Sequence, residues 1–382
     1  MRILVVANDF PYPPSHGAAV DMWTRILILI EMGYTVDLLV SVREIPNEDR
    51  LKIVRQHVRN LWVVPRRGGL RSLWSIYPFQ VRSRFDLRDV MLGHRYDVII
   101  LEAEYVAAFL NNSAAHQARL ILRVHNEQVR YFRELAEGCA SWWKKLYYYS
   151  ESFKFLFFSP TVLRKCDFLW FISDSERREH IRKHHQDKEK SMFVPTHVNP
   201  SGLRPYSSSG RTVLFIGTLT ISHNSDAIAW YVEKVHPLLN DLVGYSFQVA
   251  GRTADQPITI LKGLIEGQMN VSLEENPIVL DGLYQRAAVF VNPVIRGAGV
   301  KVKVVQALEA GLPVVSTSMG IEGTGFSDSI HLLVADTPQE FADCVRRLLL
   351  QPDLAKTLVR NAQAFLAERY DMKANMKTLT NF

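Results

Sequence analysis

Apolar runs separated by amphipathic stretches fill the first half of the chain. Each run is hydrophobic throughout, which is typical of parallel strands that are covered on both faces. One of the stretches between them has apolar residues at helical spacing from Trp23 to Ile30 and ends at Gly33. This alternation predicts a parallel α/β sheet. The expected strands lie at residues 2–8, 36–42, 97–101, 120–124, 168–172 and 192–195.

The same alternation begins again in the second half. A helix is expected between Asp226 and Leu239, with a bend at Pro237. Residues 200–211 are rich in Ser, Gly and Pro, as interdomain linkers are. The expected strands lie at residues 212–216, 247–250, 277–281, 289–293 and 313–317. We therefore predict two Rossmann-like α/β domains, 1–199 and 212–368, that face each other across a cleft.

Length and composition agree with two domains. A chain of 382 residues exceeds what one hydrophobic core usually supports. Its 47% hydrophobic and 22% charged residues are typical of a soluble globular protein. The three cysteines have no zinc-site spacing and cannot form a complete disulfide framework, which favours a reducing, cytoplasmic compartment. The apolar run up to Ala7 is too short for a signal peptide, so we expect it to be the first strand.

A βαβ unit at residues 286–323 contains a glycine loop and a basic helix start. Gly297 and Gly299 let the backbone of this loop approach a ligand closely. The helix that follows presents unpaired N–H groups and the positive end of its dipole to an anion. Lys301 and Lys303 add two charges that oppose this dipole, and a bound dianion would explain their position. The alternative is a solvated basic helix end.

Positive charge is concentrated in the first half. Residues 1–205 hold 30 basic and 22 acidic residues, a net charge of +8, whereas residues 206–382 hold 15 and 17, a net charge of −2. The basic residues are densest at 50–95, where aromatic residues are interleaved. Such a surface suits anionic lipid headgroups, nucleic acid or water. Residues 141–158, SWWKKLYYYSESFKFLFF, suit either an interfacial helix or a packing segment.

Several stretches of the chain resemble a known family. FIGTLTISHNSDAIAWYVEKVHPLL at 215–239, VNPVIRGAGVKVKVVQALEAGLPVVST at 291–317 and GIEG at 320–323 are similar to the donor domain of retaining glycosyltransferases with the GT-B fold, of the glycosyltransferase family 4 type. The first half resembles this family in the Pro-rich loop before Gly17, in RVHNE at 123–127 and in the helix cap Ser173-Asp174-Ser175-Glu176. Residues 369–382 are similar to the family's last segment, which crosses back to the first domain.

The resemblance implies a hexosyltransferase that moves a sugar from a nucleotide diphosphate to a lipid-linked or glycan acceptor, with retention of the anomeric configuration. His125 matches the family histidine that faces the sugar, and we expect it to contact a sugar hydroxyl. The second domain would bind the donor and the first the acceptor. The expected donor-binding residues are Gly17, Asn224, Arg252, Gly299, Lys301, Lys303 and Gln306. The expected acceptor-binding residues are His16, Glu104 and Glu127.

The chain departs from the family pattern at two places. The family commonly has two glutamates eight positions apart, where this chain has Ala298 and Gln306. A glutamine can still exchange hydrogen bonds with a ribose hydroxyl, so the departure concerns the sugar contact more than nucleotide binding. The family's Arg and Lys after the first donor-domain strand are also missing from residues 218–224. The diphosphate would then depend on the two lysines together with Arg296 or Arg252.

We expect no metal and no cofactor, because the chain has no Asp-x-Asp pair and its lysines can neutralise a diphosphate. The expected partners are a nucleotide sugar, a glycan or lipid-linked acceptor, and a membrane surface on the cytoplasmic side that the basic first domain meets. Nucleic acid is not among them. The alternatives are another enzyme of the same fold, such as a nucleotide-sugar epimerase or a sugar phosphorylase, and a sugar-binding module without catalysis.

Overall fold

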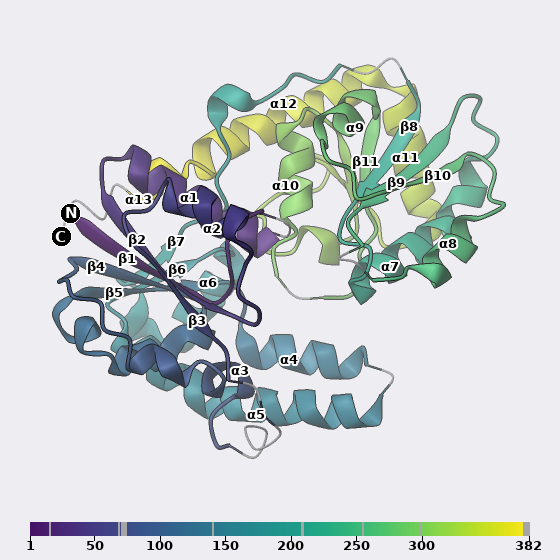
Figure 1. Ribbon diagram of the computed structural model, residues 1–382. Coiled ribbons are helices and arrows are strands. Elements are labelled where there is room, and N and C mark those ends of the chain that lie inside the picture. The colour runs from purple at the N-terminus through teal and green to yellow at the C-terminus, as the bar shows by residue number, and fades with distance from the viewer. Residues whose placement is uncertain are drawn as a thin grey trace. The chain divides into compact units, whose positions relative to one another are not determined.

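The computed structural model describes residues 1–14, 17–67, 69, 75–139, 141–207, 210–253, 256–297 and 299–376. The chain forms two compact units (Figure 1). The first runs from Met1 to His197 and includes the segment that begins at Met372, and the second runs from Val198 to Asp371. The segment 200–211, expected to be a linker, belongs to the second unit, where the N–H of Arg204 donates to the carbonyl of Glu309.

The first unit contains a sheet of seven parallel strands in the order β3-β2-β1-β4-β5-β6-β7. The strands are β1 (Arg2–Ala7), β2 (Thr35–Val42), β3 (Leu61–Pro65), β4 (Val98–Glu102), β5 (Arg119–Val124), β6 (Phe168–Phe171) and β7 (Ser191–Phe193). The helices are α1 (Gly17–Glu31), α2 (Glu48–Arg55), α3 (Phe79–Arg82), α4 (Gln128–Glu137), α5 (Trp142–Lys165), α6 (Asp174–Lys183) and α13 (Met372–Met376).

Both faces of this sheet are covered. Along β1, Ile3 and Val5 point into a core that includes residues of α1 and α13, whereas Leu4 and Val6 point into a second core on the opposite face. Successive side chains of a strand lie on opposite faces, so a run that is apolar throughout fills both cores. The buried parallel sheet that the sequence predicts is confirmed, and so is the helix cap at Ser173, whose hydroxyl accepts from the N–H of Glu176 at 3.2 Å.

The second unit repeats this architecture with a six-stranded sheet in the order β10-β9-β8-β11-β12-β13. The strands are β8 (Thr212–Ile216), β9 (Ser246–Gly251), β10 (Val271–Glu275), β11 (Val289–Asn292), β12 (Val314–Ser316) and β13 (Leu333–Val334). The helices are α7 (Ser222–Trp230), α8 (Thr259–Ile265), α9 (Asp281–Arg286), α10 (Val302–Glu309), α11 (Pro338–Leu350) and α12 (Pro352–Arg369). Two Rossmann-like α/β sheets are therefore present, as the sequence predicts.

Two expected elements of the second unit differ from the structure. The strand expected at 277–281 is wrong, because Ile278 is 99% exposed and the third strand of this sheet is β10 instead. The helix expected from Asp226 begins earlier, at Ser222, and continues after α7 through a π-helical turn, Tyr231–Val235, and a 3-10 turn, His236–Leu239. None of the described helices is both long and apolar enough to span a membrane.

Candidate functional site

Both sheets reverse their winding direction beside their first strand. In the first unit β1 lies between β2 and β4, and in the second unit β8 lies between β9 and β11. Doubly wound sheets bind ligands beyond the carboxyl ends of the strands at this point. The loops after β1 and β4 in one unit, and after β8 and β11 in the other, are therefore the places to look for a site.

Beside the first of these points, four charged side chains are buried together, each at most 1% exposed. Asp21 and Arg25 lie on α1, Glu102 ends β4, and Arg123 lies on β5. Arg25 donates to Asp21 at 2.8 Å and to Glu102 at 2.7 Å. Arg123 donates to the two carboxylate oxygens of Asp21 at 3.0 and 3.1 Å. Because buried charges need partners, this network fixes α1 against β4 and β5.

The arginines keep both acids of this network ionised. Burial tends to raise the pKa of Asp21, but Arg123 and Arg25 outweigh it and lower that pKa to about 2. Burial also tends to raise the pKa of Glu102, yet Arg25 and then His125 hold it below the ordinary value. Both carboxylates are therefore negative at neutral pH and can orient a neighbouring donor.

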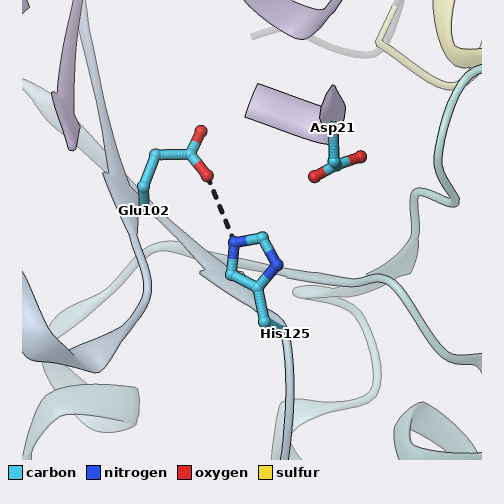
Figure 2. A group of neighbouring side chains, drawn as sticks. All are labelled: Asp21, Glu102 and His125. Carbon is cyan, nitrogen blue, oxygen red and sulfur yellow. Dashed lines mark hydrogen bonds and ion pairs between the residues drawn. The ribbon is translucent and has the colours of Figure 1, made fainter. Parts of the chain in front are cut away.

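His125 follows β5 and its ring faces Glu102, with Nε2 3.4 Å from Oε2 (Figure 2). One possible ligand atom from each of Asp21, Glu102 and His125 lies within 4.8 Å of the others, a spacing that could hold a metal ion. The carboxylates already accept hydrogen bonds from the buried guanidinium groups of Arg25 and Arg123. A cation would have to displace or approach these positive charges, so the cluster fits the positioning of His125 better than metal binding.

The residues expected to bind the acceptor are placed as follows. Glu104 is 4% exposed and accepts a hydrogen bond from the Ser159 hydroxyl at 2.5 Å. Glu127 is exposed and caps α4, because its carboxylate accepts from the N–H groups of Val129 and Arg130 at 3.0 and 2.8 Å. His16 lies outside the described residues.

Glu104 and Glu127 line the same cavity of about 560 Å³ within the first unit. Its wall is formed by residues of α4, α5 and α6, and includes Asn126, Ser159 and His180. A cavity of this size that combines acids, an amide and apolar side chains can hold a small polar ligand. The sequence did not predict it, because a cavity between three helices depends on how they pack, which no local pattern encodes.

At the corresponding point of the second unit, the loop after β8 approaches β9 very closely. Gly251 ends β9, and a Cβ on this residue would collide with the carbonyl group of Gly217. Gly217 in turn lies against Asn224, since a Cβ there would be 3.0 Å from its side-chain nitrogen. Asn224 is 4% exposed and donates to the carbonyl of Thr218 at 2.9 Å. The glycines therefore allow Asn224 to hold the loop from the first turn of α7.

Lys303 joins this loop to α10. Its Nζ donates to Oδ1 of Asn224 at 2.7 Å and lies 4.3 Å from the centre of the Phe215 ring. Burial, and then the charge of Lys301, lower the pKa of Lys303 well below its ordinary value. Among the described residues no carboxylate forms an ion pair with Lys303, so its positive form is stabilised only by an amide oxygen and a ring face.

The glycine loop before α10 holds the second lysine. Lys301 Nζ donates to the carbonyls of Gly297 and Gly299 at 2.6 and 2.7 Å. Both glycines have a positive φ, 109° and 87°, which residues with a Cβ rarely adopt. A Cβ at Gly297 would be 3.4 Å from the ring of His223. Burial, Lys303 and Lys301 lower the pKa of His223 to about 4, so this imidazole is neutral beside the two lysines.

The remaining expected donor-binding residues are less constrained. Arg252 is exposed just after β9, and Arg296 pairs with Asp226 at 2.8 Å on the surface. Gln306 is half-buried on α10. Gly17 begins α1 in the first unit, and Ala298 lies outside the described residues. The structure thus brings together Asn224, Lys301, Lys303 and the loop at Gly299, while it places Arg252 and Arg296 in solvent.

The sequence reasoning missed most of the first unit's charge network and His223. Glu102 and Arg123 interrupt runs that are otherwise apolar, which is a visible sign of a buried polar partner. Asp21 and Arg25 are four residues apart on a helix, a spacing that also forms surface ion pairs. Sequence spacing could have suggested this pair, but not that it is buried.

The fold and these two strand ends define a two-domain α/β protein whose second domain carries a glycine loop and two lysines beside its first strand. Two family models match the chain: "Glycosyl transferase 4-like domain" over residues 17–197 and "Glycosyl transferases group 1" over residues 210–351. The chain belongs to the glycosyltransferases with the GT-B fold. It is 31% identical, over 97% of both chains, to an "Uncharacterized 44.6 kDa protein in cps region" of Klebsiella pneumoniae.

Solved structures share the fold over the whole chain. A mutant of TarM of S. aureus, in complex with fondaparinux, alpha-GlcNAc-glycerol and UDP, is 10% identical, with a TM-score of 0.69 and coverage of 100% of this chain and 99% of that one. HepE of Anabaena, in complex with UDP and glucose, is 13% identical, with a TM-score of 0.68 and coverage of 100% and 98%. The expected family is thus confirmed, and these structures establish the fold.

Proposed function

We propose that this protein transfers a sugar from a nucleotide diphosphate to a glycan or lipid-linked acceptor, with retention of the anomeric configuration. The observation that carries the proposal is the setting of Lys303. A lysine that is bonded to a neutral amide, lies beside a second lysine and has a lowered pKa gains most from a nearby anion. A diphosphate leaving group supplies such an anion, and UDP in the solved structures of TarM and HepE makes uridine diphosphate the first nucleotide to test.

In this proposal the second unit binds the donor. Lys303 and Lys301 neutralise the diphosphate, and the backbone at Gly299 and the N-terminus of α10 add N–H donors. Asn224 holds Lys303 in place, and Gln306 exchanges hydrogen bonds with a ribose hydroxyl. Arg252 is exposed and contributes only its charge. Gly17 belongs to the other unit, and its contact with the donor remains an expectation from the family resemblance.

The proposed reaction breaks the bond between the anomeric carbon and the diphosphate oxygen while positive charge develops on the sugar ring. Preorganised cations around the departing oxygen stabilise this transition state. His125 contacts a sugar hydroxyl, and Glu102 positions its ring from the buried network. The acceptor hydroxyl attacks on the face that the leaving group vacates, and attack on this face retains the anomeric configuration. The proton of the hydroxyl passes to the departing phosphate.

The acceptor enters the first unit in this proposal, where Glu104 and Glu127 share a cavity. Glu127 can bind the acceptor only in part, because its carboxylate already caps α4. No metal and no cofactor takes part, since the two lysines supply the charge that a divalent ion would otherwise bring. The reaction should therefore continue in excess chelator.

In this proposal the protein is cytoplasmic, binds a membrane surface and acts in polysaccharide synthesis. The origin of the relative in a cps region supports this setting. The basic residues of 50–95 contribute less to a membrane contact than the sequence suggests. Arg84 is 1% exposed and donates to the carbonyl of Asn8, as does Arg66, while Arg67 pairs with Asp86 at 2.6 Å. Arg66 and Arg84 are thus held by the fold, whereas Arg67 is 82% exposed, so a membrane contact has to involve residues other than Arg66 and Arg84.

Release of nucleoside diphosphate tests the proposal. Purified protein is incubated with a panel of nucleotide sugars and a membrane extract that contains acceptors, with and without chelator. We expect turnover of at least one donor, and Lys303→Ala should lower kcat/KM by about 10- to 150-fold, because a charged hydrogen bond contributes roughly 1.5–3 kcal/mol. Lys262→Ala is the matched control, since this lysine forms an exposed ion pair with Glu275 on the same unit.

His125→Ala separates catalysis from donor binding. Its kcat should fall while the affinity for nucleoside diphosphate, measured by calorimetry, stays unchanged. The absence of family glutamates at 298 and 306 favours one competing function, a sugar-binding module. That alternative would be supported if nucleoside diphosphate bound normally and no donor were turned over in the presence of the extract.

A further inference from the structure

Helix α5 has two apolar faces, of which only one is packed. The inner face contributes Phe155 and Val162 to the cores of the first unit, and α5 lies beside α4 (Figure 1). The outer side chains recur every three or four positions, with an adjacent pair at either end, which keeps them on one broad helix face. They are Trp142, Trp143, Leu146, Tyr149, Phe153, Leu156 and Phe157, each 40–65% exposed.

This outer face of α5 is too large to be incidental. At 150–250 Å² for a whole aromatic side chain, the five aromatic residues and two leucines at this exposure present on the order of 700 Å² of apolar surface. The largest apolar patch of a typical monomer is about 300–600 Å². Ile76 and Tyr77, which are 85% and 41% exposed, extend it, because they line one hollow together with Phe153 and Phe157.

The exposed charged side chains of α5 are all positive. The acid of α5, Glu151, is fully buried, pairs with Lys154 at 3.0 Å and accepts from the N–H of Phe79 at 2.7 Å. Basic residues stand at both ends of the helix, and each of them is exposed: Lys144, Lys145, Arg164 and Lys165. Two lysines in the first turn of a helix oppose its dipole, which an external anion would relieve.

We propose that the outer face of α5, with Ile76 and Tyr77, docks on an anionic lipid surface. Aromatic side chains favour the boundary between headgroups and acyl chains, and lysines beside them reach the phosphates. At 1.5 Å per residue the 24 residues of α5 extend about 36 Å. This length would suffice to cross a bilayer, but α5 is not apolar enough to do so, and the helix therefore lies along the surface. This inference rests on the membrane partner of the proposed function and names the surface that meets it.

The charge pattern argues against a second copy of the chain as the occupant. Two α5 helices packed face to face in antiparallel orientation would bring Lys144 and Lys145 of one copy next to Arg164 and Lys165 of the other. Parallel packing would also place like charges together at each end. Anionic headgroups, by contrast, complement every one of these residues, at about 1 kcal/mol for each basic residue near the surface.

Vesicle sedimentation tests this proposal without any sugar donor. The full-length protein is mixed with vesicles of phosphatidylcholine alone or with phosphatidylglycerol added. We expect binding that depends on phosphatidylglycerol and weakens with salt. Phe153→Ser with Phe157→Ser should lower the partition coefficient at least tenfold, because each removes an apolar side chain from the contact. Lys144→Gln with Lys145→Gln should lower it by about 30-fold at low salt and less at high salt.

Ile278→Ser is the control, since it removes an exposed apolar side chain from the second unit. Circular dichroism establishes that each variant is folded, and sedimentation velocity reports association of the protein with itself. The proposal is overturned if the wild type does not bind phosphatidylglycerol vesicles or if the two phenylalanine substitutions leave binding unchanged. Dimers that the same substitutions dissociate, without vesicle binding, would assign the surface to a second copy. Turnover of a donor would be unaffected by that outcome, so the two proposals fail separately.

Discussion

At the scale of single residues, the structure distinguishes two ways of burying an acid. Glu102 lies against Arg25, whose charge outweighs the effect of burial and lowers the pKa. Glu104 lies against the hydroxyl of Ser159 instead. Burial dominates there, the Ser159 hydrogen bond only partly opposes it and Glu127 reinforces it, so the pKa of Glu104 rises to about 7. The first acid is fixed in one charge state, whereas the second can change its charge near neutral pH.

Stability should therefore depend on pH through Glu104. Its pKa in the folded protein, about 7, lies above the ordinary value of 4.5. The contribution of the protonated form is fully present below about pH 4.5 and is lost as the pH rises through about 7. Between pH 5 and pH 8 the wild type should lose roughly 2–3 kcal/mol more unfolding free energy than Glu104→Gln. Urea unfolding of both proteins at the two pH values measures this difference.

Glu48→Gln is the control for this experiment, because it makes the same chemical change on a side chain that is 74% exposed. It should follow the wild type at both pH values. Equal pH dependence of Glu104→Gln and the wild type would show that Glu104 is ionised in the folded protein throughout this range.

Some single residues of the candidate site could be predicted from sequence and others could not. His125 was predicted because a polar residue after an apolar run marks the carboxyl end of a strand, and Lys303 because it follows a glycine loop at the start of a helix. The pair of Asp21 and Arg123 joins residues 102 positions apart, and no local pattern encodes that contact. The same holds for Lys303 and Asn224, which are 79 positions apart.

At the scale of elements, the sequence predicted interior strands better than edge strands. Of the four edge strands, β7 was expected, whereas β3, β10 and β13 were not. An edge strand has fewer neighbours and keeps polar residues, as in β10, where Val271–Glu275 reads VSLEE and is only partly buried. The run at 277–281 is more apolar and was taken for the strand, but Ile278 and Val279 are 99% and 66% exposed.

The close approach of β9 to the loop after β8 leads to a stability prediction. Gly251→Ala would place a methyl group inside the carbonyl of Gly217, and backbone atoms cannot move aside as a flexible side chain can. We expect a loss of about 1–3 kcal/mol or more, with weaker binding of nucleoside diphosphate because Asn224 shifts with the loop. Urea unfolding and calorimetry measure the two effects.

Gly263→Ala provides the matched control. This glycine lies on α8, and a Cβ there would have nothing within 4 Å. Alanine is the better helix former, so this variant should be unchanged or more stable by about 0.5–1 kcal/mol. If Gly251→Ala were as stable as Gly263→Ala, this result would contradict the close approach of β9 to the loop after β8.

At the scale of the whole molecule, the sequence predicted two α/β domains because length and alternation both require them. The pattern alone did not predict that the end of the chain returns to the first unit, which came from the family resemblance. In the structure Met372 and Met376 of α13 are fully buried in the core that includes residues of β1 and α1. The first unit is thus built from two separate parts of the sequence.

Truncation of one buried methionine tests this arrangement. Met372→Ala should destabilise the first unit by about 2–5 kcal/mol, the usual loss when a buried methionine becomes alanine. Hydrogen exchange should accelerate in peptides from β1 and β2 and stay unchanged in α7 of the second unit.

Lys373→Ala is the neighbouring control, because this lysine forms an exposed ion pair with Glu31 that contributes little. Unchanged exchange in β1 and β2 after Met372→Ala would mean that α13 is not needed to complete the first core.

The place of α13 also sets an order of events during synthesis. The second unit is complete once Asp371 has been made, whereas the core of the first unit still lacks Met372 and Met376. Domains usually fold in the order in which they leave the ribosome. Synthesis of the first unit therefore begins before that of the second unit, but its core is completed later. Until α13 has been made, the first unit has to be kept from aggregating through its exposed core while the second unit folds.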